Sequence, residues 1–279
     1  MEYTNDDPRS KPVPLPWREP LGAWRAAMVA AGASHQTLRV RTYWITALAR
    51  HTGTGPWDVT DDALIAWAGR TAWSSETRRS AYASVRKFYD WALRAGRTSH
   101  DPSTALPRVR ESQPSPHPCP DLVLTQAAAH APDDVALMIT IASRLGLRRG
   151  EVARIHAQDL SEDLLGHSLL VHGKGGRERT VPVTDDLART IRERAGGGWL
   201  FPGRVGGHLS PDTVGRKVAR ALPQGWSMHS LRHRFGTVAY ERSQDLMAVQ
   251  RLLGHASPKT TQRYVATDAR RLRAVAAAA

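Results

Sequence analysis

The sequence has a single cysteine and few lysines among its 279 residues. Because Cys119 has no partner in the chain, an intramolecular disulfide and a cysteine-rich metal site are both excluded. It lies in a proline-rich stretch, and we expect it to have no functional role. No run of about 18 apolar residues occurs, and the first residues, MEYTNDDPRSKPVPLP, lack the charged-then-apolar order of a secretory signal. These absences predict a cytoplasmic protein without a membrane partner.

The chain is strongly basic, and arginine supplies nearly all of the excess positive charge. Lys and Arg total 39 against 26 acidic residues, which gives a formal net charge of +13. Arginine contacts phosphates through a planar, bidentate fork, and a basic surface of this kind is typical of proteins that bind nucleic acid. A charge that serves solubility, or a codon bias toward Arg, Ala and Gly, is the alternative.

The first half of the chain is predicted to be helical. Residues 1–19 are rich in proline and charge, which predicts a mobile arm. Apolar residues then recur at helical spacing in four segments, between capping residues such as Thr60 and glycines such as Gly96, and predict a four-helix domain over residues 20–98. Prolines without apolar periodicity predict an extended linker over residues 99–120.

From residue 121 onward, helical and strand signals alternate. Helical spacing over residues 131–146 and 150–160 precedes β-branched, alternating residues over 168–183. Three glycines around Lys174 predict a hairpin turn with this lysine near its tip. Helical spacing then returns in four more segments, over residues 185–196, 210–223, 230–243 and 245–255. We therefore expect a mixed α+β domain over residues 121–268 and a tail over 269–279, in a chain that is mainly α with a small β-sheet.

Two short segments of this second domain gather cationic side chains. The run HSLRHRF places His229, Arg232 and His233 three and four residues apart, and therefore on one face of a helix. The run LGLRRGE has Arg148 three residues before Glu151. A glycine-flanked arginine at a helix start can present its fork to two phosphate oxygens, although a surface ion pair has the same spacing.

A third segment, LLGHASPKTTQRY, places His255 nine residues before Tyr264. A tyrosine at such a position is more often a packing residue than a nucleophile. A zinc site formed by His229, His233 and His255 is another alternative, but the sequence lacks the glutamate that follows the first histidine in metalloprotease helices. With Lys174, the cations of the three segments could instead hold a phosphate while the phenol attacks phosphorus.

The order LGLRRGE, HGKGGRERTVPV, HSLRH and LGHASPKTTQRY resembles the catalytic domain of the tyrosine recombinase family, also called phage integrases. The resemblance extends over residues 122–268. The run SSETRRSAYASVRKFYDWALRAG, followed by HDPSTAL, is similar to the end of that family's helical core-binding domain. The resemblance implies that residues 20–98 form a SAM-like domain that binds DNA core sites and that the second domain is catalytic.

The resemblance also implies a role for each side chain. Arg148 and Arg232 are expected to clamp the scissile phosphate, and Lys174 to protonate the leaving oxygen. Glu151 and His233 match supporting positions. Two fixed guanidiniums and an imidazole can stabilise the charge of a five-coordinate phosphorus, so we expect no metal and no other cofactor.

Three further residues are implied to act on the attacking oxygen and on the phosphate. His229 would accept or share the proton of the nucleophile, and His255 would hydrogen-bond a non-bridging oxygen. Tyr264 would form a covalent 3′-phosphotyrosyl link and release a 5′-hydroxyl. Because the link keeps the bond energy, another 5′-hydroxyl can reverse the step without ATP.

The expected partner is double-stranded DNA carrying core sites. We expect a free monomer that forms a homo-tetramer on paired sites, and a directionality factor is a possible further partner. The first domain offers candidate contacts to phosphates or grooves on its basic helix faces, although such faces are usually only solvated. The candidates are Arg39, Arg41, Arg78, Arg79, Arg86 and Lys87.

Only about 20 residues precede the first predicted helix, which predicts a simple integrase of a phage or mobile element that has no arm-binding domain. Alternatives with the same chemistry are a Xer-like resolvase of chromosome dimers and a type IB topoisomerase. A helix-turn-helix repressor that does not cleave DNA is the alternative from another class.

Overall fold

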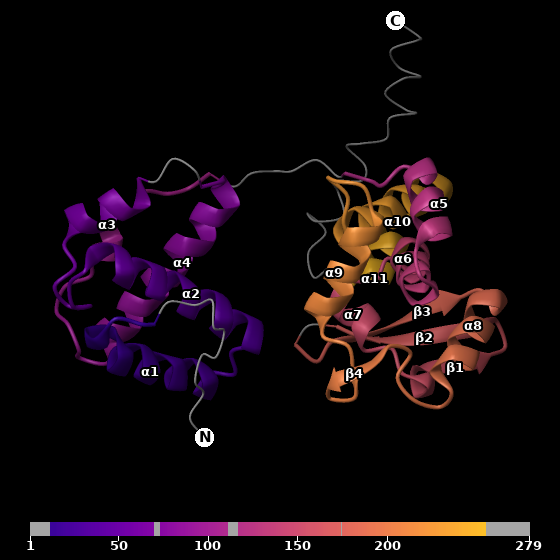
Figure 1. The fold of residues 1–279 in the computed structure, drawn as a ribbon, viewed down its shortest axis with the longest axis horizontal. Helices are drawn as coiled ribbons and strands as arrows, with labels where there is room; N and C mark the ends of the chain where they lie inside the picture. The colour runs from indigo at the N-terminus through magenta and orange to yellow at the C-terminus, as the bar shows by residue number, and fades with distance from the viewer. Residues whose placement is uncertain (1–11, 70–72, 111–116, 174, 255–279) are drawn as a thin grey trace, which may run out of the picture. The chain divides into compact units, whose positions relative to one another are not determined.

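The computed structural model describes residues 12–69, 73–110, 117–173 and 175–254. The chain divides into two compact units, residues 1–113 and 114–279 (Figure 1). Each unit has its own hydrophobic core. The structure is mostly helical with one small sheet, as the sequence predicts. In the part of the chain that is described, no helix combines the length and the apolar character that a membrane crossing requires.

The described residues of the first unit form four helices and one 3₁₀ turn. The elements are α1 (Leu15–Ala30), α2 (His35–Thr52), α3 (Asp61–Ala68), α4 (Ser75–Arg94) and η1 (Pro102–Ala105). Ser34, Thr60 and Ser74 cap α2, α3 and α4 by accepting a hydrogen bond from the backbone N–H three residues ahead. These caps explain why local sequence is enough to start the three helices.

The first helix begins earlier than the sequence predicts. The predicted mobile arm runs to residue 19, but α1 starts at Leu15 and contains Pro20. Trp17 is fully buried, and its indole N–H donates to the carbonyl of Thr54 at 2.7 Å. Proline is compatible with the first turn of a helix, so Pro16 is tolerated there, and burial of Trp17 stabilises the turn. Pro20 lies inside the helix and is itself buried.

Both ends of the predicted linker pack against a unit. Leu106 is buried in the core of the first unit. Cys119 is buried in the core of the second unit, and its backbone N–H donates to the carbonyl of Ser230 at 3.2 Å. Burial raises the pKa of the Cys119 thiol, so this cysteine serves as a core residue. The ring of His117 stacks on Trp226 with centroids 4.1 Å apart.

In its described residues, the second unit combines seven helices with an antiparallel three-stranded sheet in the order β1-β2-β3. The sheet lies at one side of the unit (Figure 1). The strands are β1 (Leu160–Asp163), β2 (Gly166–His172) and β3 (Glu178–Val183), and β2 and β3 form the predicted hairpin, with Leu169 opposite Val181. A short strand β4 (Pro202–Val205) lies outside this sheet. The helices are α5 (Asp121–His130), α6 (Asp133–Leu145), α7 (Arg149–Ala153), α8 (Asp185–Ala195), α9 (Pro211–Ala221), α10 (Met228–Ser243) and α11 (Leu246–Leu253).

The helix predicted over residues 150–160 is wrong beyond Ala153. Helix α7 ends at Ala153, and the chain continues through a 3₁₀ turn into β1. Ile155 accepts a hydrogen bond from the backbone N–H of Leu200, and Ala157 donates to Gly198. Pairing with this distant segment competes with the local helix and prevails, which apolar spacing alone cannot predict.

Candidate active site

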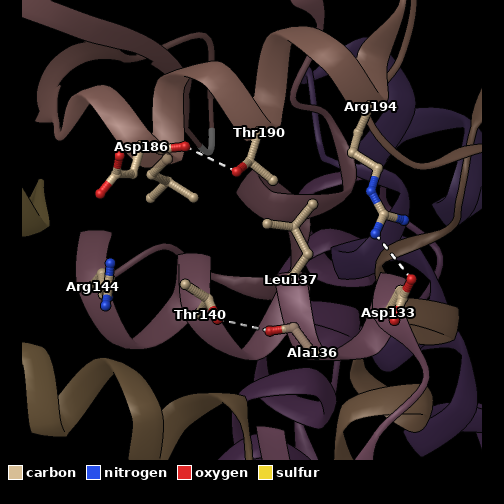
Figure 2. Close-up of a pocket in the computed structure, with 9 residues that line it drawn as sticks. Asp133, Ala136, Leu137, Thr140, Arg144, Asp186, Thr190 and Arg194 are labelled. Atoms are coloured by element: carbon tan, nitrogen blue, oxygen red, sulfur yellow. Dashed lines mark hydrogen bonds and ion pairs between the residues drawn. The ribbon is translucent and has the colours of Figure 1, made fainter. Parts of the chain in front are cut away.

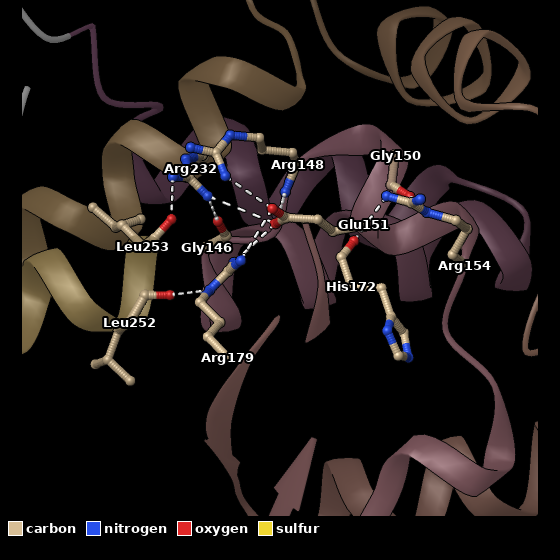
Figure 3. A network of polar contacts seen from close by, with 10 residues as sticks. All are labelled: Gly146, Arg148, Gly150, Glu151, Arg154, His172, Arg179, Arg232, Leu252 and Leu253. Carbon is tan, nitrogen blue, oxygen red and sulfur yellow. Dashed lines mark hydrogen bonds and ion pairs between the residues drawn. The ribbon is translucent and has the colours of Figure 1, made fainter. Parts of the chain in front are cut away.

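A buried carboxylate, Glu151, holds arginines from separate segments of the second unit (Figure 3). Its Oε1 atom accepts from Arg148 Nη1 at 2.8 Å and from Arg179 Nη1 at 3.0 Å. Its Oε2 atom accepts from the Arg148 backbone N–H at 2.9 Å and from Arg179 Nη2 at 2.8 Å, and lies 3.8 Å from Arg232 Nη1. Segments that begin α7, begin β3 and lie within α10 therefore meet at one side chain.

The charge of Glu151 is stabilised by this arrangement. Burial by itself raises the pKa of the carboxyl group, but hydrogen bonds from Arg179 and from the Arg148 backbone, together with both positive charges, lower the pKa to about 2. Glu151 is therefore ionised at neutral pH. It can hold the guanidiniums in fixed positions before any substrate arrives.

The backbone before Arg148 brings this arginine to Glu151. Gly146 ends α6 with φ 66°, and Arg148 occupies the N-cap position of α7, so that Glu151 falls in its first turn. A Cβ atom on Gly146 would lie 2.5 Å from the ring of Phe235 and 2.9 Å from Leu253, so a side chain has no room there. The Arg148 side chain remains 44% exposed, which leaves its outer donors open to a ligand.

Arg232 joins the ends of two helices. Its side chain is 4% exposed, and it donates from Nη1 to the carbonyl of Gly146 at 2.6 Å and from Nη2 to the carbonyl of Leu253 at 2.5 Å. Both carbonyls lie at helix C-termini, where the helix dipole favours a cation. Arg232 therefore fixes the ends of α6 and α11 relative to Glu151.

The two histidines of HSLRH lie one helical turn apart in α10. Their rings meet edge to face with centroids 4.2 Å apart. His229 is exposed and lines a hollow of about 650 Å³ together with Arg149, Asp212 and Arg216. The predicted convergence of His229, His233 and Arg232 is only partial, because Arg232 is turned into the protein while His229 faces this hollow.

Three of the predicted site residues, Lys174, His255 and Tyr264, lie outside the described part of the chain. The structure thus brings together Arg148, Glu151 and Arg232, and leaves the placement of the other three as a prediction.

Arg179 lies within the run HGKGGRERTVPV, and no role for it was predicted from the sequence. The alternation of side chains along a strand could have indicated a role for Arg179. It lies two and four residues before Val181 and Val183, and therefore on the same, core-facing side of β3. A charged residue at a core-facing position needs a charged or hydrogen-bonding partner. Glu151 is that partner.

The basic residues predicted to contact DNA from the first unit differ in how their side chains are used. Arg78 donates to the carbonyl of Ala68, and Arg86 to the carbonyl of Leu106, each at 2.6 Å. These two guanidiniums therefore contribute to the packing of the unit. The remaining candidates are exposed or half-buried and lie on α2 and α4: Arg39, Arg41, Arg79 and Lys87.

A second hollow, of about 340 Å³, lies between α6 and α8 (Figure 2). Arg194 and Asp133 form an ion pair of 3.1 Å at one end, and Arg144 and Asp186 line the other. None of the predicted site residues that the structure describes lines this hollow. We therefore assign the chemistry to Glu151 and its three arginines, Arg148, Arg179 and Arg232, which are called the Glu151 cluster.

Comparison with known proteins identifies the family of this chain. Residues 122–271 match the model of the phage integrase family. The chain is 34% identical over 281 residues to the tyrosine recombinase XerC of Rhodospirillum centenum, with 88% of this chain and 81% of that protein covered. It is 34% identical over 213 residues to the tyrosine recombinase XerD of Caulobacter vibrioides, with 67% and 68% covered.

Solved structures confirm the fold. A lambda integrase fragment (residues 75–356), solved as a dimer bound to a COC′ core site, superposes with a TM-score of 0.70 at 20% identity, covering 88% of this chain and 94% of that one. The XerH recombinase bound to a palindromic difH substrate gives 0.71 at 18% identity, covering 92% and 83%. The chain belongs to the phage integrase family and is a tyrosine recombinase, an enzyme that transfers DNA strands.

Proposed function

We propose that this protein is a site-specific recombinase that cleaves and rejoins DNA at core sites, with Tyr264 as the nucleophile. The observation that carries the proposal is the Glu151 cluster, in which both arginines are fixed in advance. Glu151 binds Arg148 directly and lies 3.8 Å from Arg232, which the carbonyls of Gly146 and Leu253 hold in place. Preorganised donors of this kind stabilise charge that develops in a transition state. Below, Arg148 and Arg232 are called the phosphate clamp.

The reaction begins when the Tyr264 oxygen attacks the phosphorus of the scissile phosphodiester. The phenol proton passes to His229, the bond from phosphorus to the 5′ oxygen breaks, and Lys174 gives that oxygen a proton. The phosphate clamp neutralises the charge on the non-bridging oxygens, and His255 donates a hydrogen bond to one of them. No metal is assigned a role, because the cations of the chain are sufficient in number for this charge.

The product is a 3′-phosphotyrosyl link and a free 5′-hydroxyl. Attack by the 5′-hydroxyl of a second strand reverses the step, restores the phenol and joins the new strands. The bond energy stays in the link, so ATP is not required. Exchange between two duplexes needs paired sites, and we propose a homo-tetramer on DNA that forms from free monomers.

The biological role that we propose is integration and excision of a phage or mobile element, with the basic helices of the first unit as the core-site binding domain. A Xer-like role in resolving chromosome dimers is the second candidate, because the relatives above are named XerC and XerD. Covalent protein–DNA adducts trapped in cells and sequenced will separate the two roles. Adducts at the ends of DNA that contains this gene indicate integration, whereas adducts at one chromosomal site away from the gene indicate resolution.

A nicked DNA duplex that contains the cleavage site identified from these adducts tests the chemistry. Loss of the short fragment downstream of cleavage prevents rejoining, so the native protein accumulates as a covalent adduct on a denaturing gel. Tyr264→Phe removes the attacking oxygen and is expected to abolish the adduct. Tyr43→Phe changes a tyrosine that is 61% exposed on α2 and should leave the adduct unchanged. An adduct formed by Tyr264→Phe at the native rate would rule out this nucleophile.

A further inference from the structure

Arg179 uses its guanidinium on two partners at once. Its Nη1 and Nη2 atoms form a fork onto the two oxygens of Glu151, at 3.0 and 2.8 Å, and its Nε donates to the carbonyl of Leu252 at 2.7 Å. The side chain is 12% exposed. A lysine cannot reproduce this geometry, because the fork and the third bond need a planar group with several donors.

These contacts connect segments that are far apart in the sequence. Arg179 is the second residue of β3, and it lies five positions after Lys174 in the chain. Glu151 belongs to α7, and Leu252 lies at the end of α11, three residues before His255. The Arg179 side chain therefore connects three segments. It joins β3 to Glu151 in α7 and to the last turn of α11.

Gly254 makes room for this contact. It ends α11 with φ 61°, and a Cβ atom on it would lie 3.1 Å from both Cδ and Nη1 of Arg179. A side chain at position 254 would therefore press on the guanidinium. Glycine is favoured at position 254 for two reasons: its φ is positive, and the Arg179 side chain leaves little room for a Cβ atom.

We propose that Arg179 is a positioning residue for the phosphate clamp, an inference that rests on the proposed function. Arg179 satisfies Glu151 from the side of β3, so that Arg148 needs to give Glu151 only one of its outer nitrogens. Without Arg179, the Glu151 carboxylate keeps Arg148 and Arg232 as its ion-pair partners among the described residues. Both would be drawn toward the carboxylate and away from the phosphate, and the net positive charge of the site would fall by one.

Single-turnover cleavage of the nicked substrate by Arg179→Ala and Arg179→Lys tests the proposal. Loss of a side chain that orients a metal ligand lowers activity by roughly 10- to 100-fold, and we expect a similar effect for a side chain that orients the clamp. We expect the rate constant of Arg179→Ala at saturating DNA to fall within this range, with Arg179→Lys recovering only part of the loss. The amplitude of the reaction, which counts correctly folded molecules, should match that of the native protein.

A purely structural role has the opposite signature. If Arg179 only stabilises the fold, the variants will react with a smaller amplitude but with the native rate constant, and that result overturns the proposal. Arg179→Lys keeps the test valid if Arg179→Ala does not fold. Arg194→Ala is the control, because Arg194 is 48% exposed and pairs with Asp133 at the hollow between α6 and α8.

The result also separates this proposal from the proposed function. Absence of a Tyr264-dependent adduct from the native protein contradicts the function itself. A native protein that cleaves normally, together with an Arg179→Ala variant that has the same rate constant and amplitude, contradicts only the role of Arg179.

Discussion

At the scale of single residues, the site depends on a carboxylate that is almost completely removed from water. A buried carboxylate without partners would be neutral, and a buried guanidinium without partners would be costly. Glu151 and its arginines solve both problems together, because each oxygen of Glu151 accepts two hydrogen bonds. The same contacts that stabilise the fold therefore also keep the clamp cationic and in place.

Glu151→Gln is expected to destabilise the second unit in a pH-dependent manner. The folded pKa of about 2 lies below the ordinary value of 4.5, so the contribution of Glu151 is complete above pH 4.5 and is lost as pH falls toward 2. The shift corresponds to about 3 kcal/mol at neutral pH. Urea denaturation followed by circular dichroism should show this loss at pH 7 and a much smaller one at pH 2.5.

The exposed Glu193 on α8 provides the control for that measurement. Glu193→Gln should leave the free energy of unfolding within about 0.5 kcal/mol of the native value at both pH values. A loss in Glu151→Gln that is equally large at pH 2.5 and pH 7 would mean that the charge of Glu151 is not the stabilising feature.

At the scale of elements, the hairpin of β2 and β3 is held by a histidine between two carboxylates. His172, the last residue of β2, contacts Asp159 through Nε2 at 2.8 Å and Glu178 through Nδ1 at 2.9 Å. Its own carbonyl accepts from Arg154 at 2.8 Å. The hydrogen bond to Asp159 and the nearby carboxylate charges raise the pKa of His172, against an opposing effect of burial.

His172→Gln should therefore destabilise the hairpin more at low pH than at high pH. A raised pKa means that the stabilisation is complete below the ordinary value of about 6.5 and is lost as pH rises through the folded pKa. We expect the urea midpoint of the variant to lie below the native midpoint at pH 6, and this gap to narrow by pH 9. The matched control is His130→Gln at an exposed position on α5, which should show no gap at either pH. A difference between the urea midpoints that widens with pH would contradict stabilisation of the hairpin by the contacts of His172 with Asp159 and Glu178.

At the scale of the whole molecule, the net charge of +13 predicts that DNA binding weakens steeply with salt. Two neighbouring residues of α4 allow the salt dependence of DNA binding to be tested separately from the stability of the first unit. The Lys87 side chain is 59% exposed and lies 3.8 Å from Asp90, whereas Arg86 donates to the carbonyls of Leu106 and Pro107. A phosphate contact can therefore be tested at position 87 with little change to the packing of the first unit.

Lys87→Gln is expected to reduce the slope of log affinity against log salt concentration by about 1, with an unchanged thermal midpoint. Arg86→Gln should lower the thermal midpoint, because the variant leaves the two carbonyls without this donor. Fluorescence anisotropy of a labelled core site over a salt series gives the slope. An unchanged slope in Lys87→Gln would remove Lys87 from the DNA-binding residues.

Local sequence determined much of the secondary structure. Hydrogen bonds and turns between residues near in the chain explain three helices and one hairpin. The helices are those capped by Ser34, Thr60 and Ser74, and the hairpin is that of β2 and β3. The prediction fails where a distant partner competes with local preference. The helix over residues 150–160 ends early because residues 155 and 157 pair with residues 198–200.

The sequence by itself also determined the family, through four runs of residues whose order and spacing are specific although each run alone is weak. Only the tertiary structure decided that Glu151 collects Arg148, Arg179 and Arg232, and that Arg232 is buried against Gly146 and Leu253. Periodicity and capping involve neighbours in the chain and leave a pattern that can be read. A buried ion-pair cluster forms between segments up to 81 residues apart, and its members are settled by how the helices and the sheet pack.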